Sequence, residues 1–212
     1  MGQVITIAQQ KGGAGKTTLA ANLAAAFAAR GLSVALLDTD PQGSLGRWFL
    51  ARRARPGLPA MEFSTASAWG VSYECEKLKK SHDIVIVDTP PKVDADLRPA
   101  LREAGLVLIP VAASHVDLWA VDGVLDLVAR EKRSAMIVLN RMKAGTRLAT
   151  SVAVAAADVA GTSGAQVASP CLAQRVSYAE TLGQGGSVVE TAGPARSEIM
   201  ALAEEVLAAL QP

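Results

Sequence analysis

The residues best suited to chemistry form a glycine-rich segment near the N-terminus, Gln10-Lys11-Gly12-Gly13-Ala14-Gly15-Lys16-Thr17. An apolar, strand-like run precedes it and a run with helical periodicity follows, which is the context that a phosphate-binding loop requires. Glycines let backbone N–H groups converge on phosphate oxygens, and the helix N-terminus adds the positive end of its dipole. The segment predicts a triphosphate site in which Lys16 reaches the terminal phosphates and the Thr17 hydroxyl ligates Mg²⁺.

This segment departs from the general pattern G-x-x-x-x-G-K-[ST] at its start. Gln10 stands where the pattern has its first glycine, and an additional lysine, Lys11, follows it. A glycine-rich turn without a ligand is the alternative interpretation. The preceding strand, the following helix and the Lys-Thr pair together favour phosphate binding.

Carboxylates end two further apolar runs. Asp38 and Asp40 follow the second run, and Asp88 ends the run at residues 84–87, just before Thr89-Pro90-Pro91. Carboxyl ends of parallel strands meet at one edge of a sheet, where Asp88 can hold a metal through water. The other two acids can serve in the outer shell of the metal and orient an attacking water. Each acid alone would suit a solvated turn, but three converging strand ends favour a site.

The elements that must position these residues alternate along the chain. Short apolar runs, most of them without period-two alternation, predict strands buried on both faces, at residues 4–8, 34–37, 84–87, 106–111, 136–139 and 165–168. Helices are predicted between and after them, at residues 17–30, 44–53, 74–80, 94–103, 117–132, 146–160, 177–182 and 196–210. This order predicts an α/β fold, a doubly wound and mainly parallel sheet flanked by helices.

Composition supports one domain with an aliphatic core. The 212 residues are 50% hydrophobic and only 4% aromatic, which suits helices packed on a buried parallel sheet. Trp48 and Trp119 are both expected in that core, with a position beside a dimer or partner surface as the alternative. The N-terminus carries no secretion signal and no apolar stretch approaches the roughly 20 residues of a membrane span, so we expect a soluble cytoplasmic protein. Cys75 and Cys171 lie far apart without metal-ligand spacing.

The net charge of +1 gives no global attraction to nucleic acid, so any affinity must come from a local patch. The interval 132–157 contains no acidic residue and five basic ones, Lys132, Arg133, Arg141, Lys143 and Arg147. It is the candidate footprint for a phosphate backbone, with a solvated loop as the alternative. No base-reading module is evident in the sequence.

Taken together, these motifs resemble the deviant Walker A, switch I and Walker B signatures of the ParA/MinD ATPases. The resemblance covers nearly the whole chain, because residues 170–175 and 183–190 are also similar to the C-terminal segment of ParA proteins. It is strongest to the short ParA type, which lacks an N-terminal helix-turn-helix domain.

The resemblance implies an ATPase that dimerises around two ATP molecules and positions or segregates a cargo. Lys11 would reach the nucleotide of the partner protomer, Asp40 would activate the hydrolytic water, and Lys16 completes the implied catalytic set. Thr17, Asp38 and Asp88 would form the Mg²⁺ shell. The implied nucleotide-binding residues are Lys11, Gly12, Gly13, Ala14, Gly15, Lys16, Thr17, Thr18 and, at the adenine, Asn140.

Implied partners are non-specific DNA of the nucleoid, contacted by Lys143, Arg147 and Arg175, and a cargo adaptor that stimulates hydrolysis. Two alternatives stay open. A MinD-like ATPase would bind membrane through a basic C-terminal helix, but here residues 198–210 are acidic on their polar positions, so no membrane contact is expected. A metabolic or redox enzyme on the same scaffold would need, in its iron–sulfur forms, cysteines that Cys75 and Cys171 are not placed to supply.

Overall fold

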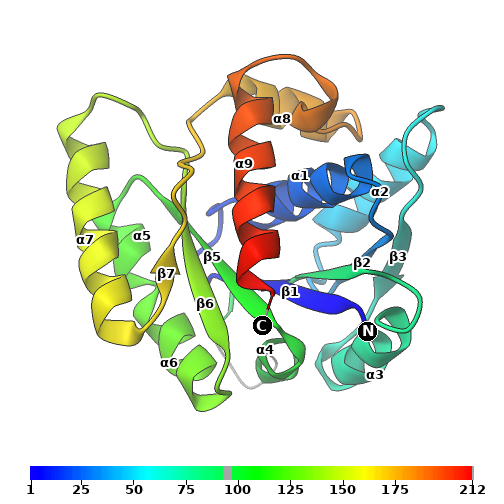
Figure 1. The fold of residues 1–212 in the computed structure, drawn as a ribbon, viewed down its shortest axis with the longest axis horizontal. Helices are drawn as coiled ribbons and strands as arrows, with labels where there is room; N and C mark the ends of the chain where they lie inside the picture. The colour runs from blue at the N-terminus through cyan, green and yellow to red at the C-terminus, as the bar shows by residue number, and fades with distance from the viewer. Residues whose placement is uncertain (93–96, 212) are drawn as a thin grey trace.

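A computed structural model describes residues 1–92 and 97–211, and the strands of this part form one sheet (Figure 1). The order across the sheet is β3-β2-β4-β1-β5-β6-β7, and every neighbouring pair is parallel. The strands are β1 (Gln3–Ile7), β2 (Val34–Asp38), β3 (Glu62–Thr65), β4 (Ile84–Asp88), β5 (Leu106–Ala112), β6 (Ser134–Asn140) and β7 (Gln166–Val167). The predicted parallel α/β sheet is confirmed.

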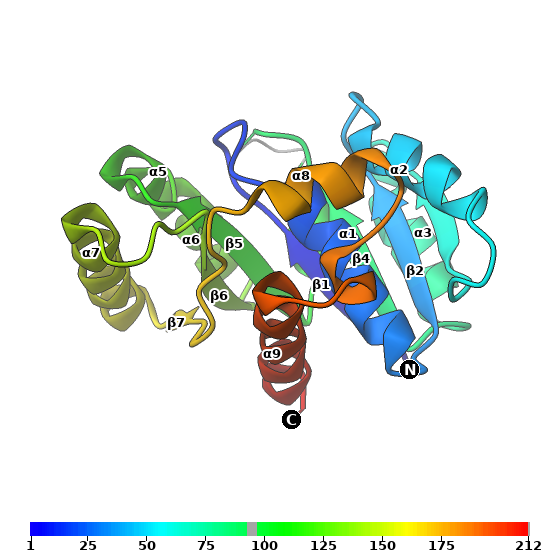
Figure 2. The same ribbon diagram turned by 90° about the horizontal axis from the view of Figure 1, so that it is seen from above.

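Helices cover both faces of this sheet (Figure 2). One layer consists of α1 (Lys16–Ala29), α2 (Ser44–Arg53), α8 (Val176–Gly183) and α9 (Pro194–Ala209). The opposite layer consists of α3 (Val71–Leu78), α4 (Arg98–Glu103), α5 (His115–Trp119), α6 (Asp122–Arg130) and α7 (Arg147–Ser163). Two short 3₁₀ turns, η1 (Ala68–Gly70) and η2 (Val188–Glu190), complete the described elements.

The pleat of the strands explains why the apolar runs show no alternation. Ile5 and Ile7 of β1 pack in the core that contains α1 and α9, whereas Val4 packs in the core that contains α3. Successive side chains point to opposite faces, and both faces are covered, so most positions are apolar. The exception in β1 is Thr6, which is fully buried and donates its hydroxyl to the carbonyl of Ala100 at 2.8 Å. Helix α1 is likewise enclosed by the sheet and by other helices, and its residues Leu19 and Phe27 are buried.

The centre of the sheet is its topological switch point. β2, β3 and β4 lie on one side of β1, and the chain then crosses from β4 to β5, β6 and β7 on its other side. Parallel sheets bind ligands at such a point, outside the carboxyl ends of the strands. Residues that follow β1, β2, β4 and β6 therefore share one crevice.

The predicted elements and the structure differ at three places. The edge strand β3 was not predicted, because it is short, only partly buried and lacks an apolar run. The single helix predicted at 117–132 is wrong: α5 and α6 are separate, and the N–H of Val121 bonds to Leu118, three residues back, at 2.9 Å. Gly123 weakens helix propagation at this point, and Val121 turns fully into the core. In the helix predicted at 94–103, residues 94–96 lie outside the described part, and α4 begins at Arg98.

The two tryptophans expected in the core have different environments. Trp48 is 3% exposed, which confirms the prediction, whereas Trp119 is 68% exposed. Trp119 is the last residue of α5, at the break between α5 and α6. The chain changes direction there, so the Trp119 side chain does not enter the core.

The C-terminal helix α9 packs its apolar side on the domain. Ile199, Leu202 and Val206 are fully buried in the core that contains α1. Among residues 1–92 and 97–211, no helix has the length and apolar character that crossing a bilayer would demand.

Candidate functional site

The glycine-rich loop between β1 and α1 has the backbone of a phosphate cradle. Gly13 and Gly15 adopt left-handed φ angles of 79° and 95°, which favour glycine. A Cβ at Gly12 or Gly13 would meet no atom within 4 Å, so the loop borders open space. The N–H groups of Gly12, Gly13, Ala14 and Gly15 donate no hydrogen bond to any described residue. Free N–H groups at a helix N-terminus bind anions.

Lys16 lies beneath this loop. The residue is 7% exposed, and its Nζ donates to the carbonyl oxygen of Gln9 at 3.1 Å. Burial lowers the pKa of Lys16, and the nearby carboxylates of Asp88 and Asp40 oppose that shift. A bound triphosphate would supply further negative charge and so restore the favourable environment of the ammonium.

Asp88 and Thr17 meet at the end of β4. The Thr17 hydroxyl donates to Asp88 Oδ2 at 2.7 Å, while the buried Oδ1 has no partner among the described residues. Desolvation raises the pKa of Asp88 to about 7, despite the Thr17 hydrogen bond. Such an oxygen can accept a hydrogen bond from a metal-bound water.

Replacing Asp88 by asparagine should stabilise the nucleotide-free protein. The substitution removes a desolvated negative charge and keeps an oxygen for the Thr17 hydrogen bond, so it relieves a cost of about 1–3 kcal/mol. For a chain of this size we expect the midpoint of thermal unfolding at pH 8 to rise by roughly 2–10 °C. Because the pKa of the folded-state carboxyl is raised, this group removes stability as pH rises from about 4 to 7. The gain should therefore be smaller at pH 5, as calorimetry can check.

Asp38→Asn is the matched control for this prediction. Both oxygens of Asp38 accept backbone N–H groups, from Asp40 at 3.0 Å and Gly46 at 3.1 Å. An amide can replace only one of these acceptors, so the midpoint should fall. A midpoint that falls for Asp88→Asn as well would show that burial of the Asp88 charge does not destabilise the nucleotide-free protein.

Asp38 and Asp88 are direct neighbours across β2 and β4, as the paired register of their Cα atoms shows. Burial raises the pKa of Asp38, against the effect of its two backbone hydrogen bonds. Asp40 lies two residues on, half-buried, and its Oδ1 accepts the N–H of Gln42 at 2.9 Å. The structure thus brings the three predicted acids to the loop that follows β1.

Lys11 has a partner that the sequence analysis missed. Its Nζ forms an ion pair with Asp117 in the first turn of α5. The Asp117 side chain is 10% exposed and the Lys11 side chain 41%. Asp117 follows β5, so the convergence of strand ends places it at the same edge of the sheet as Lys11, but it does not by itself pair the two residues.

Asn140, at the end of β6, braces the glycine-rich loop. Its Nδ2 donates to the carbonyl of Ala14 at 2.8 Å, and its Oδ1 accepts the N–H of Arg141 at 2.9 Å. The side chain fits tightly, because a Cβ on Gly15 would lie 2.4 Å from Nδ2. Asn140 thereby links the end of β6 to the cradle.

A cavity of about 620 Å³ opens beside Asn140 and Thr18, between α2 and α8. Trp48, Arg141 and Arg175 also line it, and its volume is sufficient for a nucleoside. Arg175 does not extend freely from it, since its guanidinium bonds Glu198 at 2.6 Å.

The acid-free interval 132–157 does not form one patch, which corrects the prediction. Lys132 and Arg133 precede β6, whereas Arg141, Lys143 and Arg147 follow it. The seven residues of β6 separate the two groups by about 23 Å. Lys143 and Arg147 are exposed on the same edge of the sheet as the glycine-rich loop.

The residues of this site fit a magnesium triphosphate. The loop offers unpaired N–H groups, Lys16 offers a buried cation, and Asp88 offers an oxygen without a partner. Thr17, Asp38 and Asp88 would hold the metal, which would neutralise charge on the phosphates.

Comparison with known proteins agrees with this geometry. Residues 5–188 match the CobQ/CobB/MinD/ParA nucleotide-binding domain. The chain is 28% identical over 214 residues to maintenance of carboxysome distribution protein A of Halothiobacillus neapolitanus, covering 96% of this chain and 95% of that protein. It is 29% identical over 245 residues to the chromosome-partitioning ATPase Soj of Thermus thermophilus, covering 98% and 96%.

Solved structures share the fold. The ATP complex of a McdA variant from Cyanothece superposes with a TM-score of 0.80 at 18% identity, covering 99% of this chain and 96% of that one. MinD of Aquifex aeolicus gives 0.80 at 22% identity, covering 97% of each chain. With a match over most of its length and a phosphate cradle in place, the chain belongs to the CobQ/CobB/MinD/ParA nucleotide-binding family and is an ATP-binding ATPase of its ParA/MinD branch.

Proposed function

We propose that this ATPase closes into a dimer around ATP, binds nucleoid DNA without sequence preference, and positions or segregates a cargo until a cargo adaptor stimulates hydrolysis. The observation that carries the proposal is the placement of Lys11, Lys143 and Arg147 on one edge of the sheet with the nucleotide site. One nucleotide can then control both self-association and DNA contact.

In this cycle, Lys16 binds the terminal phosphates and Asp40 orients the attacking water. Thr17, Asp38 and Asp88 hold Mg²⁺, while Asn140 borders the base and ribose in the adjoining cavity. These roles are supported by the buried Lys16 ammonium, the orphaned oxygen of Asp88 and the cavity that begins at Thr18.

Lys11 acts across the dimer in this proposal. Its side chain is partly exposed and bonds an acid of its own protomer rather than the glycine-rich loop. The phosphates of a second protomer would offer more negative charge than the single Asp117 carboxylate. Closure of the dimer would therefore transfer Lys11 from Asp117 to the partner's nucleotide, which makes closure dependent on the triphosphate.

The cargo is a DNA locus or a cytoplasmic protein assembly. The relative from Halothiobacillus neapolitanus is named for carboxysome distribution and the relative from Thermus thermophilus for chromosome partitioning. Contact with a membrane is not part of the proposal, because the apolar side of α9 is occupied by the protein core.

Removing the cations beyond β6 should weaken DNA binding. We expect the double variant Lys143→Ala/Arg147→Ala to lose about tenfold or more in affinity for random duplex DNA in the presence of ATP. The dimer loses four cations, so the plot of log affinity against log salt should be less steep by about 3–4. Fluorescence anisotropy over a salt titration, with ATP, ADP and no nucleotide, measures both quantities.

The matched control is Lys132→Ala/Arg133→Ala, which removes two cations from the opposite end of β6. This variant should bind DNA like the natural protein. If Lys132→Ala/Arg133→Ala lost affinity and Lys143→Ala/Arg147→Ala did not, the DNA contact would lie at the opposite end of β6 from the nucleotide site. Equal binding with ATP, ADP and no nucleotide would argue against a nucleotide-controlled DNA contact.

A further inference from the structure

The segment 184–190, between α8 and α9, bonds to both helices that frame the nucleotide site. On one side it contacts α1, the helix that begins at the phosphate cradle. Asn22 of α1 is fully buried, and its Oδ1 accepts hydrogen bonds from Ser187 Oγ at 2.8 Å and from the N–H of Val188 at 3.0 Å. The Nδ2 of Asn22 donates to the carbonyl of Thr18, so the segment is tied to the first turns of α1.

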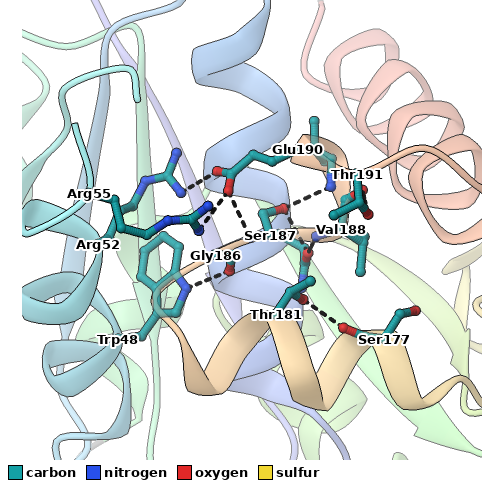
Figure 3. Close-up of polar contacts among 12 residues, drawn as sticks. Trp48, Arg52, Arg55, Ser177, Thr181, Gly186, Ser187, Val188, Glu190 and Thr191 are labelled. Carbon is teal, nitrogen blue, oxygen red and sulfur yellow. Dashed lines mark hydrogen bonds and ion pairs between the residues drawn. The ribbon is translucent and has the colours of Figure 1, made fainter. Parts of the chain in front are cut away.

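On the other side the segment contacts α2 (Figure 3). Glu190 lies between two arginines of that region: it pairs with Arg52 through Oε1 and with Arg55 through Oε2, the latter at 3.0 Å. The indole N–H of Trp48 donates to the carbonyl of Gly186 at 2.8 Å. The segment thus contacts the middle of α2, its last turn and a residue just beyond it.

Arg52 makes this attachment unusually dependent on one partner. It is 4% exposed, and its Nε has no hydrogen-bond partner among the described residues. Glu190 is the carboxylate that neutralises its charge, and the guanidinium carbon lies 5.3 Å from the centroid of the Trp48 ring. A buried cation that loses its counterion is strongly destabilised, so Glu190 controls where this end of α2 can lie.

Backbone packing leaves little freedom at the same point. Gly185 adopts a φ of +67°, and a Cβ there would lie 2.4 Å from the backbone nitrogen of Arg52. The loop and the helix are therefore in direct backbone contact, which holds the two at a fixed distance.

The near end of α2 holds the acids of the site. Gly46, in its first turn, donates its N–H to Asp38 Oδ2 at 3.1 Å, and Asp40 lies in the short turn between β2 and α2. Arg52 is six residues further along a rigid helix, or about 9 Å away. A displacement of α2 at Arg52 therefore moves Gly46, and with it the acids.

We propose that Glu190 is a positioning residue for ATP hydrolysis: by bonding Arg52 and Arg55 it holds α2, and through α2 the Asp38–Asp40 turn, at a fixed place relative to α1 and the phosphate cradle. The inference rests on the proposed function for the identity of the reaction. Glu190 does not contact the reacting groups. It acts through α2, which determines the position of the Asp38–Asp40 turn.

The test is Glu190→Gln, which keeps the shape of the side chain and removes its charge. We expect the turnover number for ATP to fall by about 10- to 100-fold, because an error of about 1 Å in placement costs about 100-fold. The affinity for a non-hydrolysable ATP analogue should change by less than about threefold, since α1 keeps its bonds to Ser187 and Val188. Turnover should be measured at temperatures well below the midpoint of thermal unfolding. The number of functional nucleotide-binding sites should be titrated for each variant, so that turnover can be expressed per site.

Hydrogen exchange gives a readout independent of activity. Amides in residues 38–47 should exchange about tenfold faster in Glu190→Gln, whereas residues 12–20 should exchange at the natural rate. If Glu190→Gln fails to fold, Arg55→Ala replaces it as the test variant. The Arg55 side chain is 41% exposed, so Arg55→Ala should fold. Its turnover should fall by a smaller factor, about two- to fivefold, because an exposed ion pair contributes little. Glu204→Gln removes an exposed partner of Arg30 on α9 and is the control that should change nothing.

Unchanged exchange at 38–47 together with natural turnover per titrated site would overturn the proposal. A turnover loss explained fully by fewer nucleotide sites would do the same, because it would reduce Glu190 to a structural role. Absence of ATP hydrolysis in the natural protein would instead refute the proposed function, and the exchange result would still decide whether Glu190 positions α2.

Discussion

Lys16→Ala should abolish ATP binding at micromolar protein concentrations. The ammonium lies beneath the cradle, 7% exposed, where its charge is desolvated and ready to meet phosphate oxygens. Two hydrogen bonds to charged groups contribute about 1.5–3 kcal/mol each, so their loss corresponds to about 10²- to 10⁴-fold in the dissociation constant. Isothermal titration calorimetry with magnesium and a non-hydrolysable ATP analogue measures this directly.

Lys11→Ala is the matched control for Lys16→Ala. The two lysines are five positions apart, but Lys11 pairs with Asp117 outside the cradle. In the proposed cycle it acts on the nucleotide of the partner, so a protomer lacking it should still bind the analogue while failing to dimerise. Equal losses of affinity for the analogue in the two variants would mean that both lysines bind the same nucleotide. An unchanged affinity in Lys16→Ala would mean that the glycine-rich loop is not the phosphate site.

Asp40→Ala should retain the ATP-bound dimer and lose turnover. The carboxylate lies in the turn between β2 and α2, beside Asp38, where it can orient and deprotonate a water. General-base contributions are typically about 10²- to 10⁴-fold, so turnover should fall by that factor. Light scattering after size exclusion reports the dimer, and phosphate release reports turnover.

Asp40→Asn separates the charge from the shape of the turn. The side chain of Asp40 accepts the N–H of Gln42 at 2.9 Å, and an asparagine oxygen can accept the same bond. We expect Asp40→Asn to be as slow as Asp40→Ala if the charge matters. An Asp40→Ala protein that hydrolyses ATP at the natural rate would refute the role assigned to this residue.

The parts that could be predicted from the sequence are those encoded by local patterns. Continuous apolar runs predicted six of the seven described strands, because strands covered on both faces have few polar positions. The cradle was also predictable, since its glycines, lysine and threonine are adjacent in the chain. Strand β3 was missed because its residues Glu62–Thr65 contain no apolar run.

Contacts between distant residues could not be predicted in this way. The pair of Lys11 with Asp117 and that of Arg52 with Glu190 join residues more than a hundred positions apart, and nothing in either segment alone specifies the other. The basic interval 132–157 was misassigned for the opposite reason. Residues close in sequence were assigned to one patch, although β6 carries Arg133 and Lys143 to opposite ends of the sheet.

The sequence by itself determined the fold class and the triphosphate cradle, because each depends on residue types at short, fixed spacing. Only the tertiary structure decided which acid holds Lys11, which cations share an edge with the nucleotide and how residues 184–190 connect α1 to α2. These depend on the order of strands in the sheet and on the packing of helices across it. Both are set by the burial of apolar surface from the whole chain rather than by any one segment.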